Sequence, residues 1–280
     1  MKSLAILGPG LLGGSLALAA RRAGGWRVAL WARRAEAVAE IDCMGIADAV
    51  STDLRGIVAG ADLVILCVPA GAMPALAREI ADTVSPRTIV TDVGSVKASV
   101  VAELGEIFRG RARFVGSHPM AGSEQTGIRA ARADLFEDAA CILTPDGASD
   151  PEALAELRAF WQKLGCRVIE VAPAAHDEIV ALVSHLPHLI AATLVQTVVA
   201  ENARALDFTG PGFRDTTRVA AGPPAMWAEI LRTNAPAVRK SAEAMIEKLR
   251  GILTLLDREQ PMTDFLTEAK TQRDRLRPLK

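Results

Sequence analysis

The sequence predicts an α/β protein in two parts, a doubly wound parallel sheet over residues 1–172 and an all-helical part over residues 173–280. Three observations lead to this prediction. Short apolar runs alternate with helical patterns in the first part, which is typical of parallel sheets with right-handed crossovers. A glycine-rich turn joins the first apolar run to the first helical pattern. After Pro173 no further run of strand type follows, and the apolar residues recur at helical spacing.

The individual elements follow from the residues of each run. The run DLVILCV, which ends at Val68, is continuous and β-rich, as expected for a strand covered on both faces of a sheet. Asp150 is a candidate N-cap for the helix after it, because a short side-chain acceptor can satisfy free backbone N–H groups. The predicted strands cover residues 3–7, 27–31, 62–68, 88–93, 113–116, 140–143 and 166–171. The predicted helices cover residues 11–23, 72–84, 151–164, 174–204, 225–258 and 262–276.

The composition excludes several classes of function. The 280 residues include no tyrosine, which rules out mechanisms that need a phenol as acid or base, such as that of the short-chain dehydrogenases. A net charge of −1 argues against a nucleic acid or an acidic membrane as partner, since their binders usually carry a basic excess. Three residues before the first apolar run leave no room for a secretory signal, and the cysteines form no C-x-x-C pair. We therefore expect a cytoplasmic protein.

One stretch is long and apolar enough to raise the question of a membrane span. Residues 179–200 carry no formal charge over 22 positions, and a bilayer helix needs about 20. Polar side chains interrupt the stretch at a density that is costly in lipid. We therefore expect a soluble, buried helix.

Gly8, Gly10 and Gly13 form a G-x-G-x-x-G motif between the first predicted strand and the first predicted helix, the context in which this motif binds dinucleotides. Gly8 permits the tight turn, and Gly10 lets the backbone approach a pyrophosphate, whose charge the helix N-terminus stabilises. Gly13 allows close packing of helix on strand. With Leu11 and Leu12, the motif predicts a dinucleotide site in a Rossmann-type sheet; the alternative is a glycine-rich turn that binds nothing.

The end of the second predicted strand bears on which dinucleotide is bound. NAD-binding proteins usually carry Asp or Glu there, to accept from the ribose 2′-OH, whereas this sequence has Arg33 and Arg34. Two guanidiniums suit a 2′-phosphate, so NADP is favoured over NAD; alternatively, both arginines are merely solvated. Val68 and Pro69 end a strand at the same crevice, where Pro69 is expected to shape the loop.

With tyrosine absent, the four histidines are the candidates for proton transfer, because the pKa of imidazole lies near neutrality. His118 follows the predicted strand 113–116 in a loop rich in Gly and Ser, and Ser95 follows the strand before it. Both are expected at the crevice that holds the nicotinamide. His176 lies at the charged start of a helical pattern and is interpreted as a residue that begins a helix.

Ser184, His185 and His188 lie in the motif S-H-L-P-H. Ser184 and His188 are four residues apart and share one helix face. Pro187 removes a backbone N–H and predicts a kink. Polar groups at a kink in an apolar helix indicate the wall of a site; the alternative is a pair of hydrogen-bonded core histidines. No acidic or cysteine partner accompanies the two histidines, so no metal site is predicted.

Five motifs in sequence order make the chain similar to the prephenate dehydrogenase family, which includes the arogenate dehydrogenases. They are G-x-G-x-x-G, D-x-G-S-V-K at 92–97, H-P-x-A-G-x-E-x-x-G at 118–127, S-H-L-P-H at 184–188, and GFRDTTRVA at 212–220 followed by Met-Trp. The resemblance covers almost the whole chain. It implies NAD(P)-dependent oxidative decarboxylation of prephenate or arogenate in tyrosine biosynthesis, and a homodimer formed through a helical dimerisation domain.

The resemblance also implies roles for single residues. His118 matches the histidine that hydrogen-bonds the ring hydroxyl of the substrate and helps to remove its proton. Ser95 matches the serine that orients this hydroxyl, and Arg218 matches the arginine that binds a substrate carboxylate. Ser184 and His188 match residues of the substrate pocket.

Three further matches lie at the mouth of that pocket. Glu124 and Asp215 match acids that form an ionic gate with arginine. Trp227 matches an aromatic residue that the second subunit contributes. Pro211 stands where many relatives have glycine.

Two alternatives remain open at this point. A β-hydroxyacid dehydrogenase has a similar layout but uses a catalytic lysine on the inter-domain helix, whereas this sequence has no lysine between Lys163 and Lys240. A non-catalytic NAD(P)-binding sensor would need neither the His118 loop nor the polar residues at 184–188.

Overall fold

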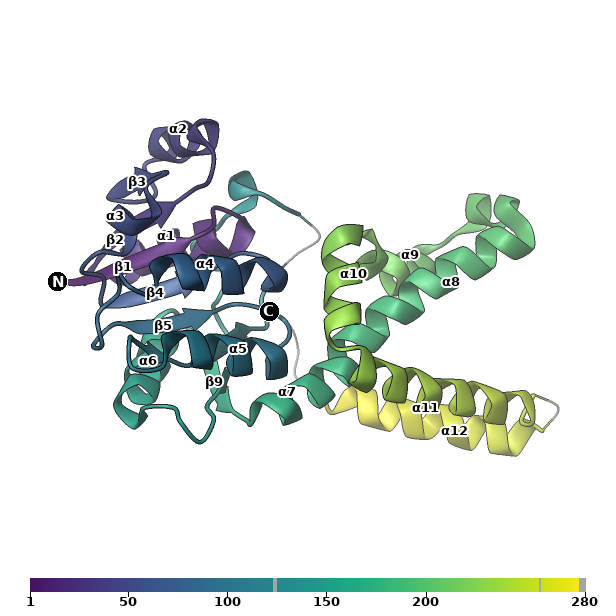
Figure 1. The fold of residues 1–280 in the computed structure, drawn as a ribbon. Helices are drawn as coiled ribbons and strands as arrows, with labels where there is room; N and C mark the ends of the chain where they lie inside the picture. The colour runs from purple at the N-terminus through teal and green to yellow at the C-terminus, as the bar shows by residue number, and fades with distance from the viewer. Residues whose placement is uncertain (123–124, 257, 277–280) are drawn as a thin grey trace.

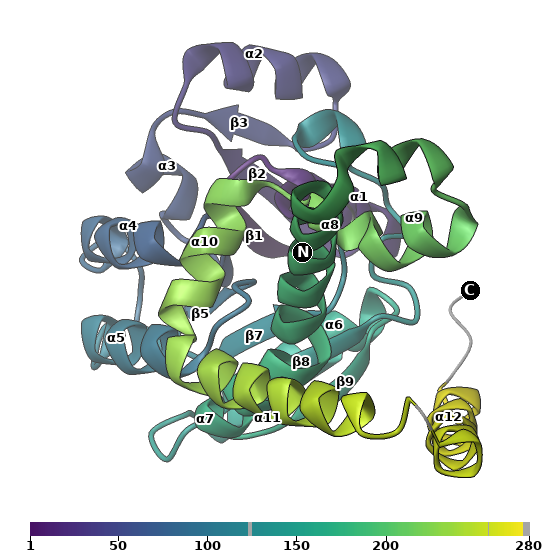
Figure 2. The same ribbon diagram turned by 90° about the vertical axis from the view of Figure 1, so that its right-hand side faces the viewer.

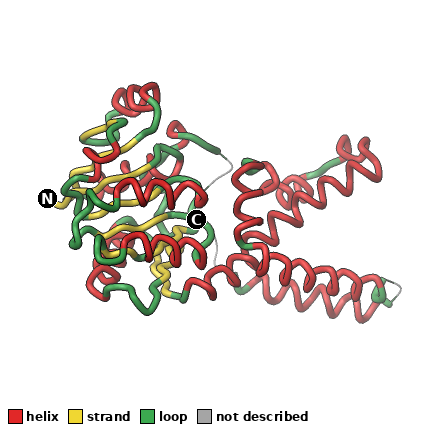
Figure 3. The backbone as a smooth tube through the Cα atoms, viewed as in Figure 1, coloured by secondary structure: helices red, strands yellow, loops and turns green. Residues whose placement is uncertain are grey.

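The computed structural model describes residues 1–122, 125–256 and 258–276. These residues form a sheet-containing part and a group of long helices beside it (Figure 1). The strands are confined to the first part, and the part of the chain described after Glu170 contains helices and turns alone (Figure 3).

A six-stranded parallel sheet forms the centre of the first part, with the order β3-β2-β1-β4-β5-β6. The order reverses between β1 and β4, and ligands of such sheets bind outside the carboxyl ends of the strands at this point. The strands are β1 (Lys2–Leu7), β2 (Trp26–Trp31), β3 (Ala49–Ser51), β4 (Leu63–Leu66), β5 (Ile89–Asp92) and β6 (Arg113–Phe114).

Helices cover both faces of this sheet because the side chains of each strand alternate between two cores. On β1, Leu4 and Ile6 belong to the core that includes Trp161 of α6, whereas Ala5 and Leu7 belong to the opposite one. The helices of this part are α1 (Leu11–Ala23), α2 (Ala35–Met44), α3 (Leu54–Val58), α4 (Met73–Ile80), α5 (Ala98–Phe108) and α6 (Pro151–Lys163), with the short turns η1 (Ala70–Ala72) and η2 (Ile128–Ala130). The predicted cap of α6 is confirmed, since the Asp150 side chain accepts from the backbone N–H of Ala153.

The prediction of one parallel sheet is wrong for the last strands. β7 (Gly116–Pro119), β8 (Ala140–Thr144) and β9 (Arg167–Glu170) form a separate three-stranded sheet, in which β7 and β8 are antiparallel. β7 was not predicted from the sequence, because its residues, GSHP, are typical of a loop. All four are nevertheless buried. His118 therefore lies in a strand and not in a loop. β3 was missed because it has only three residues.

The helical part begins at Pro173. Its first predicted helix is divided into α7 (Pro173–Val180), a π-helical turn (Ala181–His185) and α8 (Leu186–Asn202). The irregular turn directly precedes Pro187, as expected for a proline that cannot donate to the preceding turn. The remaining elements are η4 (Ala203–Phe208), α9 (Pro211–Thr217), η5 (Arg218–Ala221), α10 (Pro224–Thr233), α11 (Ala235–Leu253) and α12 (Glu259–Asp274). Viewed from the helical side, α8 and α10 lie in front of the sheet (Figure 2).

The expectation that residues 179–200 form a buried helix is wrong within a single chain. The helical stretch Pro173–Phe208 has a mean hydropathy of 1.6 in its most apolar window, of which 28% is buried. Leu182, Val183 and Phe208 are largely exposed, and so are Leu249 and Leu253 on α11. Exposed apolar surface of this extent marks a site of interaction with another protein or with a membrane.

Close packing of α1 on β1 leads to a prediction for stability. A Cβ atom on Gly13 would lie 1.9 Å from the backbone oxygen of Gly8, so Gly13→Ala should lower the free energy of unfolding by about 1–3 kcal/mol. Gly105 is a matched control inside α5, because a Cβ there meets no atom within 4 Å. Gly105→Ala should raise the free energy of unfolding by about 0.5–1 kcal/mol. Urea unfolding measures both changes, and equal effects of the two substitutions would contradict the packing argument.

Candidate active site

The glycine-rich turn between β1 and α1 has the shape that a dinucleotide needs. Gly8 has φ +125°, and a Cβ there would lie 2.4 Å from the Cys67 backbone oxygen. A Cβ on Gly10 meets no protein atom within 4 Å. Gly8 and Gly13 are therefore required by packing within the protein, whereas the space beside Gly10 is open. No side chain caps the N-terminus of α1, so its first N–H groups remain available to an anion.

A cavity of about 350 Å³ lies at this turn, which is within the usual size of a small-molecule site. Its wall includes the start of α1, the loop after β4, the loop after β5, and α10 of the helical part, and the first three of these segments carry predicted residues. The predicted residues among its lining are Gly10, Leu11, Leu12, Val68, Pro69 and Ser95. Glu229 of α10 also lines the cavity and accepts a hydrogen bond from the backbone N–H of Gly71, which links the two parts across it.

Arg33 and Arg34 follow β2 and are both exposed. Arg34 is the N-cap residue of α2, and its side chain does not cap the helix. Neither arginine lines the cavity, and in the described part of the chain neither is paired with a carboxylate. The structure therefore leaves both guanidiniums exposed where the chain leaves the second strand.

His118 belongs to a buried chain of hydrogen bonds that the sequence analysis did not foresee. Its Nδ1 atom lies 2.8 Å from Nε2 of His176, and Nδ1 of His176 lies 2.8 Å from Oδ1 of Asp177. The His176 side chain is fully buried. The interpretation of His176 as a residue that merely begins a charged helix is therefore wrong. The available signal was spacing, because His176, Asp177 and Val180 form the buried face of α7.

The Asp177 carboxylate is bound to the first turn of α5. Oδ1 accepts from the backbone N–H of Lys97 at 2.7 Å, and Oδ2 accepts from that of Ala98 at 2.9 Å. Burial alone would raise the pKa of Asp177, but the hydrogen bonds from His176 and from these two N–H groups lower it below its usual value. Asp177 is therefore an anion that joins α7 to the N-terminus of α5.

A fully buried ion pair lies beneath this junction. Lys97 Nζ donates to Oδ2 of Asp92, and neither side chain is exposed to solvent. Asp92 also accepts from the backbone N–H groups of Gly94 and Ser117. The first and last residues of the D-x-G-S-V-K motif are thus bound to each other. The pair restrains the loop between them, which carries Ser95 into the cavity wall.

The two histidines of the S-H-L-P-H motif have different surroundings. His185 is a buried, hydrogen-bonded core histidine, with Nδ1 at 3.2 Å from Nδ2 of Asn234. His188 instead stacks on Trp227, with ring centroids 3.6 Å apart and an interplanar angle of 11°. Ser184 is half-buried. This contact of Trp227 lies within one chain, and its contribution to a second subunit stays a prediction.

Burial lowers the pKa of three of the histidines. Burial lowers the pKa of His118 well below its usual value, with further lowering by His176, Lys97 and His185. Burial also lowers the pKa of His185 to about 4 and lowers that of His188. An uncharged imidazole can accept a proton, so His118 has the protonation state that a general base requires.

The remaining predicted residues lie on or near α9. Asp215 is exposed within this helix, and Arg218 is exposed at the start of the next turn, which packs against α8. Pro211 is the first residue of α9, a position at which proline is favoured because no helical N–H is lost. Glu124 lies outside the described residues.

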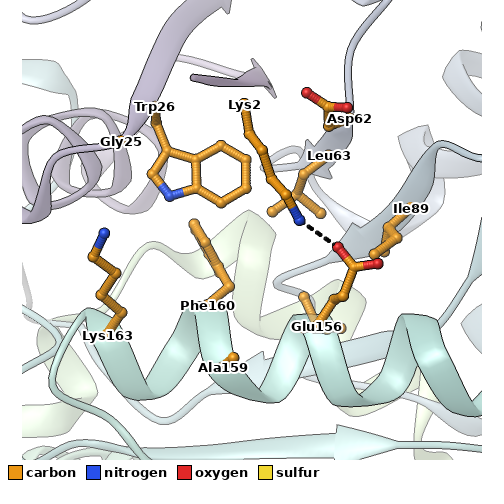
Figure 4. Close-up of a pocket in the computed structure, with 11 residues that line it drawn as sticks. Lys2, Gly25, Trp26, Asp62, Leu63, Ile89, Glu156, Ala159, Phe160 and Lys163 are labelled. Atoms are coloured by element: carbon orange, nitrogen blue, oxygen red, sulfur yellow. Dashed lines mark hydrogen bonds and ion pairs between the residues drawn. The ribbon is translucent and has the colours of Figure 1, made fainter.

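A second cavity, of about 260 Å³, lies at the amino ends of the strands and not at the crevice (Figure 4). Trp26 and Phe160 meet edge to face within it, and Lys2 pairs with Glu156. Asp62 accepts from the backbone N–H of Ser3, and Lys163 donates to the backbone oxygen of Gly24. None of the predicted site residues lines this cavity. Of the predicted chemical residues, Ser95 lines the first cavity, whereas His118, His188 and Arg218 are not among its lining residues.

Comparison with known proteins shows which protein family the chain matches. A family profile described as the prephenate dehydrogenase nucleotide-binding domain matches residues 16–170, and one described as the prephenate dehydrogenase dimerization domain matches residues 172–270. Cyclohexadienyl dehydrogenase of Zymomonas mobilis is 35% identical over 95% of this chain and 92% of its own length.

Two solved structures extend this similarity to the fold. Prephenate dehydrogenase of Aquifex aeolicus, in complex with hydroxyphenyl propionate and NAD⁺, is 32% identical, with a TM-score of 0.91 over 98% of this chain and 97% of that one. Arogenate dehydrogenase of Synechocystis is 31% identical, with a TM-score of 0.84 over 97% of this chain and 99% of that one.

The buried histidines predict a loss of stability in acid. Between its usual pKa of 6.5 and the lowered value of about 4, His185 takes up a proton in the unfolded chain but not in the folded one. The free energy of unfolding should therefore fall as pH drops through this range, by about 1 kcal/mol per pH unit for this group. His185→Asn keeps an acceptor near Asn234 but cannot titrate, so its stability should depend less steeply on pH. Urea unfolding at several pH values measures both slopes, and equal slopes would contradict the prediction.

Proposed function

The chain belongs to the prephenate dehydrogenase family, and from this premise we propose that it catalyses the NAD(P)-dependent oxidative decarboxylation of prephenate or arogenate. Prephenate would yield 4-hydroxyphenylpyruvate, and arogenate would yield tyrosine. The observation that carries the proposal is the buried chain of His118, His176 and Asp177. It lies next to β5, the strand whose following loop lines the dinucleotide cavity.

The two alternatives have less support. The first, a β-hydroxyacid dehydrogenase, belongs to a different family and needs a lysine where this chain has none between Lys163 and Lys240. The second, a sensor that only binds NAD(P), has no use for an uncharged, buried histidine hydrogen-bonded to a second histidine and a carboxylate. A reaction that removes a proton requires such a group.

The residues around the cavity fit a nicotinamide dinucleotide. Gly8, Gly10 and Gly13, with the first N–H groups of α1, would hold the pyrophosphate, while Val68 and Pro69 would border the remainder. When bound, the nicotinamide supplies the acceptor for the hydride that leaves the alcohol carbon of the substrate ring.

His118 and Ser95 would act on the ring hydroxyl of the substrate. His118, uncharged because it is buried, takes the hydroxyl proton. Ser95 orients the hydroxyl from the loop between Asp92 and Lys97, which the buried ion pair restrains. The ring carboxyl group leaves as CO₂ while the ring becomes aromatic. Aromatisation supplies the driving force, so the protein needs mainly a base and precise orientation.

The other substrate contacts are assigned by resemblance to the family. Arg218 would bind a substrate carboxylate through two parallel hydrogen bonds, with Glu124 and Asp215 as acids at the pocket mouth. Ser184 and His188 would line the pocket, and the stacking of His188 on Trp227 supports this role by fixing the imidazole ring.

We further propose that residues 1–172 and 173–280 are the two domains, and that the protein is a soluble, cytoplasmic homodimer. The exposed apolar side chains of the stretch Pro173–Phe208 and of α11 support a second copy as the partner, because the matched helical family is a dimerization domain. Dimer formation would cover the apolar surface that the single chain leaves open.

The proposal is tested by a steady-state assay of NAD(P)H formation with prephenate and arogenate, each with NAD⁺ and NADP⁺. At least one combination should show turnover. His118→Asn should lower kcat by about 100-fold or more, because it removes the base, and should leave the KM for the cofactor nearly unchanged. No NAD(P)H from the wild-type protein with either substrate would show that the proposed function is wrong.

Arg33 and Arg34 support NADP as the preferred cofactor, since both are exposed beyond β2. In the double variant Arg33→Ser/Arg34→Ser, the KM for NADP⁺ should rise about tenfold or more while that for NAD⁺ changes little. Serine at position 34 also suits the N-cap of α2. Arg27→Ser is a matched control, because Arg27 is an exposed arginine near the start of β2. Equal effects on both cofactors would refute the preference.

A further inference from the structure

We propose that His176 and Asp177 are positioning residues that hold His118 in one tautomer, with the proton on Nδ1 and the lone pair on Nε2. The inference rests on hydrogen bonds within the protein. Its catalytic consequence, that Nε2 is the atom that takes the substrate proton, rests on the proposed function.

At Asp177 the direction of hydrogen-bond donation is not ambiguous. An ionised carboxylate can only accept hydrogen bonds. Both Asp177 oxygens already accept from backbone N–H groups at the start of α5, and the pKa of the carboxyl lies below its usual value. The 2.8 Å contact with His176 therefore requires a proton on Nδ1 of His176.

The next bond follows from the chemistry of neutral imidazole, in which one ring nitrogen donates and the other accepts. With its proton on Nδ1, His176 presents a lone pair at Nε2. The His118 nitrogen 2.8 Å away must then donate, so Nδ1 of His118 carries the proton. Nε2 of His118 is left with the lone pair.

The other possibility is a second proton on His176, which would reverse the bond to His118. It would put an imidazolium in a fully buried position. The carboxylate bound to it, Asp177, is already stabilised by two N–H groups and by the N-terminus of α5. Lys97 lies close enough to lower the pKa of His118 by its charge, which further disfavours another cation here. We therefore assign His176 as neutral.

The chain is held at its far end by the helical part of the protein. Asn234, which is 4% exposed at the junction of α10 and α11, donates from Nδ2 to the backbone oxygen of Asp177 at 2.8 Å. Hydrogen bonds through His176 and Asp177 thus connect His118 in β7 to two helices, α5 and α11. A carboxylate that fixes a histidine tautomer in this manner is an established aid to general-base catalysis.

The tautomer can be measured directly in the full-length wild-type protein. Only four histidines are present, so ¹⁵N-histidine labelling gives eight ring-nitrogen resonances that single His substitutions can assign. We expect Nδ1 of His118 and Nδ1 of His176 to be protonated near neutral pH, and Nε2 of both to be unprotonated. A proton on Nε2 of His118, or on both nitrogens of His176, would overturn the proposal without any variant.

Two substitutions at His176 then test its effect on catalysis. His176→Phe keeps an aromatic ring but removes both hydrogen bonds, so His118 should lose its single tautomer and kcat should fall on the order of 100-fold. His176→Gln can still offer an amide oxygen to Nδ1–H of His118 and should retain the tautomer and more of kcat. The KM for the cofactor should stay within about twofold in both variants, since neither touches its site.

The outcomes separate this inference from the proposed function. If His118 is a mixture of both tautomers in His176→Phe but kcat is unchanged, the positioning role is wrong although the enzyme is active. If the wild-type tautomers are as expected but neither substrate turns over, the proposed function fails while the assignment of the protons stands. Loss of kcat by the same factor in the Phe and Gln variants, with His118 unchanged in both, would indicate a merely structural role and would also overturn the proposal.

Discussion

One carboxylate connects the parts of this protein on which its chemistry depends. Asp177 binds the N-terminus of α5 through both oxygens, His176 through one of them, and Asn234 through its backbone oxygen. A buried anion is tolerated only where such partners replace water. The helical half therefore docks on the sheet in one arrangement, and this same arrangement brings His176 against His118.

The same requirement explains why so many polar groups are buried around β7. Asp92 and Lys97 neutralise each other without access to solvent, and Ser117 is bound to the backbone oxygen of Asp92. Removing either ionic partner would leave an uncompensated charge, which costs far more than the pair contributes. Leu182, Val183 and Phe208 are the opposite case, since these apolar side chains of the stretch Pro173–Phe208 are exposed in the single chain.

The sequence was informative wherever the interaction is local. The glycine turn, the bounds of α1 and the cap at Asp150 depend on residues a few positions apart, and their predictions are confirmed. The errors concern contacts between distant segments. β7 read as a loop because its pairing with β8 is what makes it a strand. His176 was interpreted as a residue that begins a helix, because its partner, His118, lies 58 positions away.

By itself, the sequence determined the alternation of strands and helices in the first part, the glycine-rich turn and the family, because each depends on short motifs and their spacing. Only the tertiary structure decided which residues act together. It separated the last strands into a second sheet, buried His185 while stacking His188 on Trp227, and joined His118 to His176 and Asp177. The physical reason is that a buried polar side chain must find its partner in space, and spacing along the chain does not specify that partner.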